Sequence, residues 1–231
     1  MKSLNKFERH SYLYSAWVAM LIPMLIATYM FFCVVNNGTV SVIKLIVGFT
    51  PAICFTAMGY FMRLVFKETS KKILQHPLFK EDETRMPTTE SLLWSTQIMS
   101  KAQKQQIHRQ VKEDFGISLL TESEERKNGR EARLTIVDAI GKIRNTTRGN
   151  TILLKANYEY GFWRNLIGGF AWALLFVIIL FVSNAYITHI SCWWFIGAIV
   201  LIISFAAFDY LVCFGSSARY YAKQLFAAYL P

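Results

Sequence analysis

Three long runs without a charged residue constrain this chain more than any other feature of its sequence. No Lys, Arg, Asp or Glu occurs in Tyr12–Val35, Leu45–Met62 or Asn165–Phe208. A helix needs about 20 apolar residues to cross roughly 30 Å of hydrocarbon, so each of the first two runs is long enough for one span and the third for two. The sequence therefore predicts four transmembrane helices in two pairs and excludes a water-soluble monomer.

The charged residues between these runs predict the orientation. Arg63–Arg164 holds 19 Lys+Arg and 13 Asp+Glu, a net charge of +6 out of +10 for the chain. The short connections Asn36–Ser41 and Thr188–Ser191 carry no Lys or Arg, whereas both ends of the chain carry a net positive charge. Because Lys and Arg accumulate on the cytoplasmic side of membranes, the N-terminus, the central region and the C-terminus are expected in the cytoplasm.

The same pattern predicts the fold class and the domains. We expect an all-α integral membrane protein, with a helical cytoplasmic domain inserted between spans 2 and 3. An N-terminal cytoplasmic segment with the first transmembrane hairpin would occupy residues 1–66, and the ligand-sensing domain residues 67–164. The second hairpin would occupy residues 165–214, and an amphipathic cytoplasmic tail residues 215–231.

Start and stop signals divide the central region into helices. One helix is predicted from about Ser91 to Phe115, where Gly116 ends it. Thr121 and Glu124 form a capping box that starts the next helix. We expect that helix to be interrupted at Asn128-Gly129 and to resume as far as Thr147, and a last helix, Ile152–Asn165, to lead into the third span.

Two of the predicted helices carry cations beside an apolar stripe, and these are the candidate phosphate-binding residues. Each row falls within an arc of about 80° or less on a helical wheel. The first row contains Lys101, Lys104 and His108, and the second contains Arg133, Arg144 and Arg148. Arg side chains at such borders bind phosphate bidentately. The alternatives are contacts with lipid headgroups or ion pairs with the acidic residues of the same region.

Any pore must form between subunits, because four spans with so little polarity cannot enclose water within one chain. We therefore expect a cyclic homo-oligomer in membrane lipid, most simply a tetramer. Asn184 and Asp209 are the candidate pore residues, since polar groups at membrane depth usually face a bundle interior or water. The alternative for Asp209 is a position near the headgroups, paired with Arg219, Arg63 or a backbone amide.

Motifs for catalysis, cofactors and metals are missing from the sequence. It contains no P-loop, GxGxxG or HExxH pattern, and the four cysteines show neither CxxC spacing nor a neighbouring histidine pair. We therefore expect no enzyme activity, no cofactor and no metal. The cysteines are expected to be free thiols, with a Cys33–Cys192 bridge as the alternative.

The order of short motifs in the central region resembles a known family. The motifs are Met86-Pro87-Thr88-Thr89, Lys104 with His108, Leu120-Thr121 with Glu124-Glu125, Ile143-Arg144 with Thr147-Arg148, and Asn157 with Tyr160-Gly161-Phe162 and Arg164-Asn165-Leu166. They resemble a bacterial family of four-span membrane effectors of anti-phage operons, the membrane components of Hailong-type systems. The chain departs from that pattern at Ala156, Asn128-Gly129, Gly149 and Trp163, where the family has an acid, Asp-Pro, Asp and Arg.

This resemblance implies a function and a set of roles. It implies an inner-membrane ion channel that binds a nucleotide or single-stranded oligonucleotide made by an operon-encoded nucleotidyltransferase, and that depolarises the cell when open. The implied ligand residues are Lys104, His108, Arg144, Arg148 and Arg164. Asn157, Tyr160, Gly161 and Asn165 are the expected coupling residues, because their segment joins the ligand-binding helices directly to the third span. The competing hypothesis is a membrane sensor or scaffold that recruits a soluble defence partner and conducts nothing.

Overall fold

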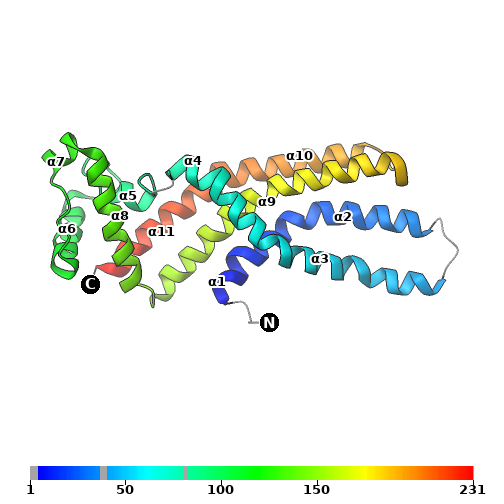
Figure 1. The fold of residues 1–231 in the computed structure, drawn as a ribbon, viewed down its shortest axis with the longest axis horizontal. Helices are drawn as coiled ribbons and strands as arrows, with labels where there is room; N and C mark the ends of the chain where they lie inside the picture. Colours follow the sequence, from blue (N-terminus) through cyan, green and yellow to red (C-terminus); the bar gives the residue numbers. More distant parts are fainter. Residues whose placement is uncertain (1–4, 37–40, 81–82, 231) are drawn as a thin grey trace. The chain divides into compact units, whose positions relative to one another are not determined.

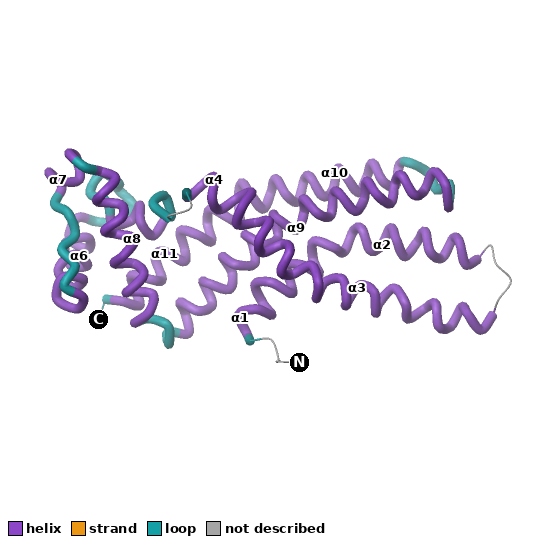
Figure 2. The backbone as a smooth tube through the Cα atoms, viewed as in Figure 1, coloured by secondary structure: helices purple, strands orange, loops and turns teal. Residues whose placement is uncertain are grey.

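The computed structural model describes residues 5–36, 41–80 and 83–230, and every regular element in those ranges is a helix (Figures 1 and 2). The all-α prediction is therefore confirmed for the part of the chain that the structure describes. Contacts divide the chain into a first unit, Met1–Leu74 with Gly161–Phe214, and a second unit, Gln75–Tyr160 with Gly215–Pro231.

The first unit is built from long helices and three π-helical turns at helix ends. Its N-terminal half contains α1 (Lys6–Glu8), the π-helical turn η1 (Arg9–Leu13), α2 (Tyr14–Asn36), α3 (Ser41–Ser70) and most of the π-helical turn η2 (Lys71–Gln75). Its C-terminal half contains most of α9 (Thr151–Ile187), α10 (Trp193–Phe208) and the π-helical turn η3 (Asp209–Phe214).

The second unit is built from shorter helices. They are α4 (His76–Phe79), α5 (Pro87–Leu92), α6 (Lys101–Phe115), α7 (Glu122–Lys127), α8 (Gly129–Thr146), the first residues of α9, and α11 (Gly215–Tyr229). α8 packs against α5, α6, α7 and α11, and α5 also packs against α11.

Within the described ranges, three helical stretches are long and apolar enough to cross a membrane. They are Lys6–Val34, Thr151–Ile187 and Trp193–Tyr229, whose most apolar 18-residue segments have mean hydropathies of 2.1, 2.6 and 2.3. The second predicted span, Leu45–Met62, is part of α3, but its first residues lie outside the range whose side chains the structure describes. A fourth span therefore stays a prediction.

Apolar side chains from four helices form the core of the first unit. α2 contributes Ala16, Ala19, Met20 and Met30, α3 contributes Met62 and Phe66, α9 contributes Leu166, Phe170, Ala173 and Val177, and α10 contributes Phe195, Ala198 and Ile202. All of these side chains are buried. The four helices thus share one dry core, and their other faces carry large exposed apolar residues such as Leu25, Phe61 and Trp193.

Glycines on α9 allow it to approach its neighbours closely. A Cβ atom added at Gly168 would lie 2.2 Å from Ser70 Oγ, 2.9 Å from Ser70 N and 3.0 Å from Phe66 O. A Cβ atom at Gly169 would lie 2.6 Å from Cβ of Ala19. α9 therefore touches the backbone of α3 and the surface of α2 through positions where a side chain does not fit.

The predicted helix Ser91–Phe115 is wrong in its first half. α5 ends at Leu92, an extended segment follows, and α6 begins after Ser100, whose hydroxyl accepts a hydrogen bond from Gln103 N at 3.3 Å. The break arises because distant side chains bind the backbone groups of Leu93–Thr96, as described below, so these groups need no helical partners.

The other local predictions for the second unit agree with the structure. Gly116 ends α6 with φ of 69°, and Thr121 N donates to Glu124 Oε2 at 2.8 Å in the predicted capping box. Asn128 separates α7 from α8, as predicted. In the first unit all four cysteines are free, so the alternative Cys33–Cys192 bridge is not formed.

We predict that Gly168→Ala destabilises the first unit by about 1–3 kcal/mol, because the new methyl group collides with backbone atoms of α3 that cannot move alone. Thermal unfolding of the full chain in detergent measures this. The control is Gly197→Ala on α10, where a Cβ atom meets nothing within 4 Å and better helix propensity should leave stability equal or slightly higher. Equal unfolding temperatures for both variants would contradict the close packing of α9 on α3.

Candidate functional site

Lys104 and Glu125 hold the extended segment Leu93–Thr96 from two sides. Lys104 is 1% exposed, and its ammonium donates to the carbonyl of Leu93 and, at 2.5 Å, to that of Thr96. Glu125 accepts hydrogen bonds from Trp94 N at 2.8 Å and Ser95 N at 2.9 Å. A buried cation on the carbonyls and a buried carboxylate on the amides thus satisfy the segment that leaves the helix.

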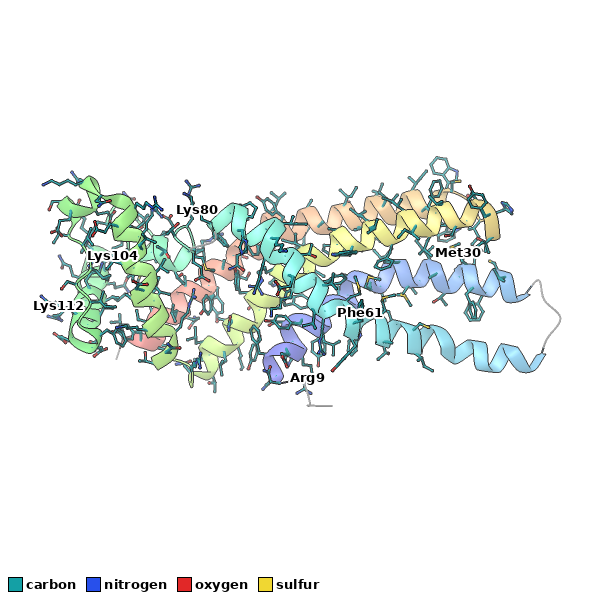
Figure 3. All side chains as sticks on the ribbon, in the orientation of Figure 1. Arg9, Met30, Phe61, Lys80, Lys104 and Lys112 are labelled. Carbon is teal, nitrogen blue, oxygen red and sulfur yellow. The ribbon has the colours of Figure 1, made fainter. Side chains whose placement is uncertain are left out.

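His108 packs on the same segment. Its ring centroid lies 4.7 Å from that of Trp94, and its Nε2 lies 3.4 Å from the carbonyl oxygen of Leu92. Burial lowers the pKa of His108 and is also the main cause that lowers the pKa of Lys104. Lys104, labelled in Figure 3, is therefore part of the interior of the second unit with its ammonium already engaged, and His108 lies half-buried on the same segment.

Acidic partners hold most of the other predicted ligand cations. Arg133 donates to Thr84 O at 2.7 Å and to Glu90, and Arg144 donates to Glu83 at 2.8 Å. The exposed Lys101 lies 3.2 Å from Glu122. These contacts match the ion-pair alternative for the two rows.

The structure does not bring the predicted ligand residues into one site. The α6 row and the α8 row share no hydrogen-bond partner among the described residues, Arg148 is exposed at the end of α8, and Arg164 belongs to the first unit. As for metals, the described residues include no group of three His, Cys, Asp or Glu side chains that could hold an ion.

Asn165 ties α9 to η1 and α3 inside the first unit, and we call the set of Ser11, Ser70, Gly161 and Asn165 the Asn165 joint. The Asn165 side chain is fully buried and donates to Ser11 O at 2.7 Å. Ser70 Oγ donates to Phe66 O, and it lies 3.5 Å from Asn165 O. A Cβ atom at Gly161 would lie 2.7 Å from Ser11 Oγ, so the glycine keeps the helices close.

The other predicted coupling residues precede the joint on α9. Tyr160 is buried in the second unit and stacks on Tyr221 of α11, with ring centroids 6.1 Å apart and an interplanar angle of 18°. Asn157 is half-buried. Arg164 is buried, and its Nε lies 3.4 Å from Asn165 Oδ1.

The two candidate pore residues are buried within the chain. Asn184 binds the turn between α9 and α10, because its side chain donates to Ile190 O at 2.8 Å and accepts from Ile190 N at 2.7 Å and Thr188 Oγ1 at 2.6 Å. Asp209 is 1% exposed, and its carboxylate has no hydrogen-bond partner among the described residues. Neither side chain reaches the surface of the chain in this conformation.

Sequence reasoning missed the partners rather than the central residues. Asn165 was identified, but Ser11 lies 154 residues away and Ser70 lies 95 residues away, and neither stands in a recognisable motif. Glu125 was named only as part of the Glu124-Glu125 motif, while its hydrogen bonds go to Trp94 and Ser95. No local sequence pattern indicates that a carboxylate in the first turn of a helix binds backbone amides of a distant segment, as Glu125 does.

We predict that Glu125→Ala lowers the stability of the second unit by about 3 kcal/mol, because two partly buried amides lose a charged acceptor. Thermal unfolding followed by circular dichroism measures the loss. Glu113→Ala, an exposed site on α6, is the control and should change stability by less than ~0.5 kcal/mol. If the two variants unfold alike, Glu125 does not hold the extended segment.

We predict that acidification destabilises the second unit through His108. Because burial lowers its pKa in the folded state, the unfolded chain binds a proton first as the pH falls. This contribution to stability is complete above the unfolded pKa of about 6.5 and is lost as the pH falls through the folded value. Unfolding temperatures between pH 8 and pH 5 should fall less steeply for His108→Gln than for the wild type. His189→Gln, at an exposed position, should keep the wild-type slope, and an unchanged slope for His108→Gln would show that another group titrates.

Comparison with known proteins gives no relative from which a function could be transferred. No protein-family model, curated protein or solved structure matches the chain. Its function must therefore be inferred from its own residues and contacts.

Proposed function

We propose that the chain is the subunit of an oligomeric ion channel of the bacterial inner membrane, gated by an anionic nucleotide or oligonucleotide. In this proposal α2, α3, α9 and α10 are the four spans, and the second unit and both termini lie in the cytoplasm. Opening depolarises the cell in response to phage infection, and a partner nucleotidyltransferase supplies the ligand.

One observation carries this proposal, namely that α9 is shared by both units. Its residues up to Tyr160 belong to the second unit, and its residues from Gly161 belong to the first. The Asn165 joint begins at that boundary and fixes α9 against η1 and α3. Because a continuous helix transmits displacement along its axis, a change of ligand state in the second unit acts on the joint.

Charge supports an anionic ligand for the second unit. Several of its cations are exposed and have no ion-pair partner among the described residues, among them Lys80, Arg85, Arg130 and Arg148. Phosphate groups are the anions that such Arg-rich surfaces bind most strongly in proteins.

The packing of the first unit supports a pore between subunits. Its core is filled by apolar side chains, so no polar path runs through the described part of one chain. Exposed apolar faces on the same helices are available to lipid and to neighbouring subunits, as in a ring of four copies.

A second candidate function is a membrane scaffold that binds the same ligand, recruits a soluble partner and conducts nothing. The burial of Asn184 and Asp209 favours it, because neither candidate pore residue faces the outside of the chain. In the channel proposal, ions reach Asp209 only after η3 rearranges.

We predict that ion flux through liposomes containing the purified chain depends on a nucleotide or oligonucleotide ligand, and that Asn165→Ala removes this dependence. The variant loses the hydrogen bond to Ser11 O and should conduct alike with and without ligand, while its affinity for the ligand stays within about twofold. Fluorescence of an entrapped ion-sensitive dye measures the flux.

The control for this experiment is Ser204→Ala on α10, whose hydroxyl bonds only to the carbonyl of Val200 in its own helix among the described residues. It should keep the ligand dependence. Ligand binding without flux in any condition would reject the channel and favour the scaffold. Normal gating by Asn165→Ala would reject the joint as the coupling element.

A further inference from the structure

A strongly basic pocket lies where the turn after α4 meets the start of α8. Its volume is about 430 Å³, and its walls are formed by Lys80, Thr84, Arg85, Gly129, Arg130 and Arg133. Four of these six residues are cations, and none of the described lining residues is acidic or aromatic. Of the four, only Arg133 was identified from the sequence as a ligand residue.

Hydrogen bonds close the turn that forms one wall of the pocket and join it to the other wall. Arg85 N donates to Phe79 O at 3.1 Å and Met86 N donates to Glu83 O at 3.0 Å, which closes the turn. Arg133 then joins this turn to α8, because its guanidinium binds Thr84 O at 2.7 Å and also Glu90. The pocket is thus built from two segments about fifty residues apart that Arg133 holds together.

The pocket has more positive charge than the described protein groups neutralise. Glu90 pairs with Arg133, whereas Lys80, Arg85 and Arg130 have neither an ion pair nor a hydrogen bond from the side chain to another described residue. Like charges held around one cavity repel one another, so a bound anion stabilises the arrangement. Gly129 adds space, since a Cβ atom there would meet nothing within 4 Å.

We propose that this pocket binds a chain of two or three linked phosphates on a soluble ligand. This inference rests on the proposed function and deepens it, because it locates the phosphates of the gating ligand. Three cations without a partner among the described residues match the charge of a diphosphate or triphosphate better than that of a single phosphodiester. Arg side chains also bind such oxygens in pairs. Because no aromatic side chain lines the pocket, the base of a nucleotide makes no stacking contact there.

The test is calorimetric titration of the full chain in a neutral detergent with AMP, ADP, ATP, GTP and pyrophosphate. The affinity should rise from AMP to ADP to ATP, should be equal for ATP and GTP within about threefold, and should fall with added salt. The double variant Arg85→Glu with Arg130→Glu should bind ATP at least tenfold more weakly, because two cations are replaced by anions. The charge-matched control, Arg109→Glu with Lys112→Glu on the exposed face of α6, should bind ATP within about twofold of the wild type.

Three results would overturn this pocket as the site. They are equal affinities for AMP and ATP, unchanged ATP binding by the Arg85/Arg130 double variant, and binding to phosphatidylglycerol nanodiscs instead of to soluble phosphates. None of these results decides whether the chain is a ligand-gated channel, because the flux measurement in liposomes tests that separately. Conversely, the double variant could weaken ATP binding while the wild-type chain conducts no ions. That result would support the pocket as the binding site and reject the channel.

Discussion

The second unit depends on one arrangement, in which the buried Lys104 ammonium binds two carbonyls and the buried Glu125 carboxylate binds two amides of the same short segment. Burying either charge alone would be costly, but here each is hydrogen-bonded and the two signs compensate each other. The result is a non-helical connection that separates α5 from α6 and draws α7 onto it. His108 and Trp94 then pack on this connection, so the polar centre of the unit also organises its aromatic packing.

This arrangement divides the cations of the second unit into two kinds. Lys104 and Arg144 are occupied by backbone or acidic partners, and they contribute to the fold whether or not a ligand is present. Lys80, Arg85 and Arg130 have no such partner among the described residues and surround a cavity. The net charge of the second unit therefore overstates the positive charge that is available to bind a ligand. The relevant quantity is the charge left after the structural pairs are formed.

The sequence predicts those features whose cause is local. Lipid requires long uncharged helices, so the spans within Thr151–Ile187 and Trp193–Tyr229 can be recognised from the uncharged run Asn165–Phe208 alone. The capping box at Thr121 can also be recognised, because it depends on four consecutive residues. The helix break after Leu92 depends on Glu125, which binds Ser95 from 30 residues further along the chain, so the hydrophobic periodicity of the segment does not reveal it. The basic pocket likewise joins Lys80 and Arg85, on either side of a turn, with Arg130 at the start of another helix about 45 residues away, and no local motif links the two segments.

The Asn165 joint is suited to hold two states rather than to bend gradually. Ser11 belongs to the π-helical turn η1, where the backbone ladder changes register, and its carbonyl accepts from both Asn165 and Ser15. At Gly161 the backbone of α9 lies so close to Ser11 that a Cβ atom there would overlap it. No flexible side chain stands between them that could adjust to a small displacement of α9. Tightly packed contacts of this kind resist small shifts and yield by a change of register. The π-helical turn η1 is the place in this joint where the helix already departs from α-helical hydrogen bonding, so a change of register would begin there.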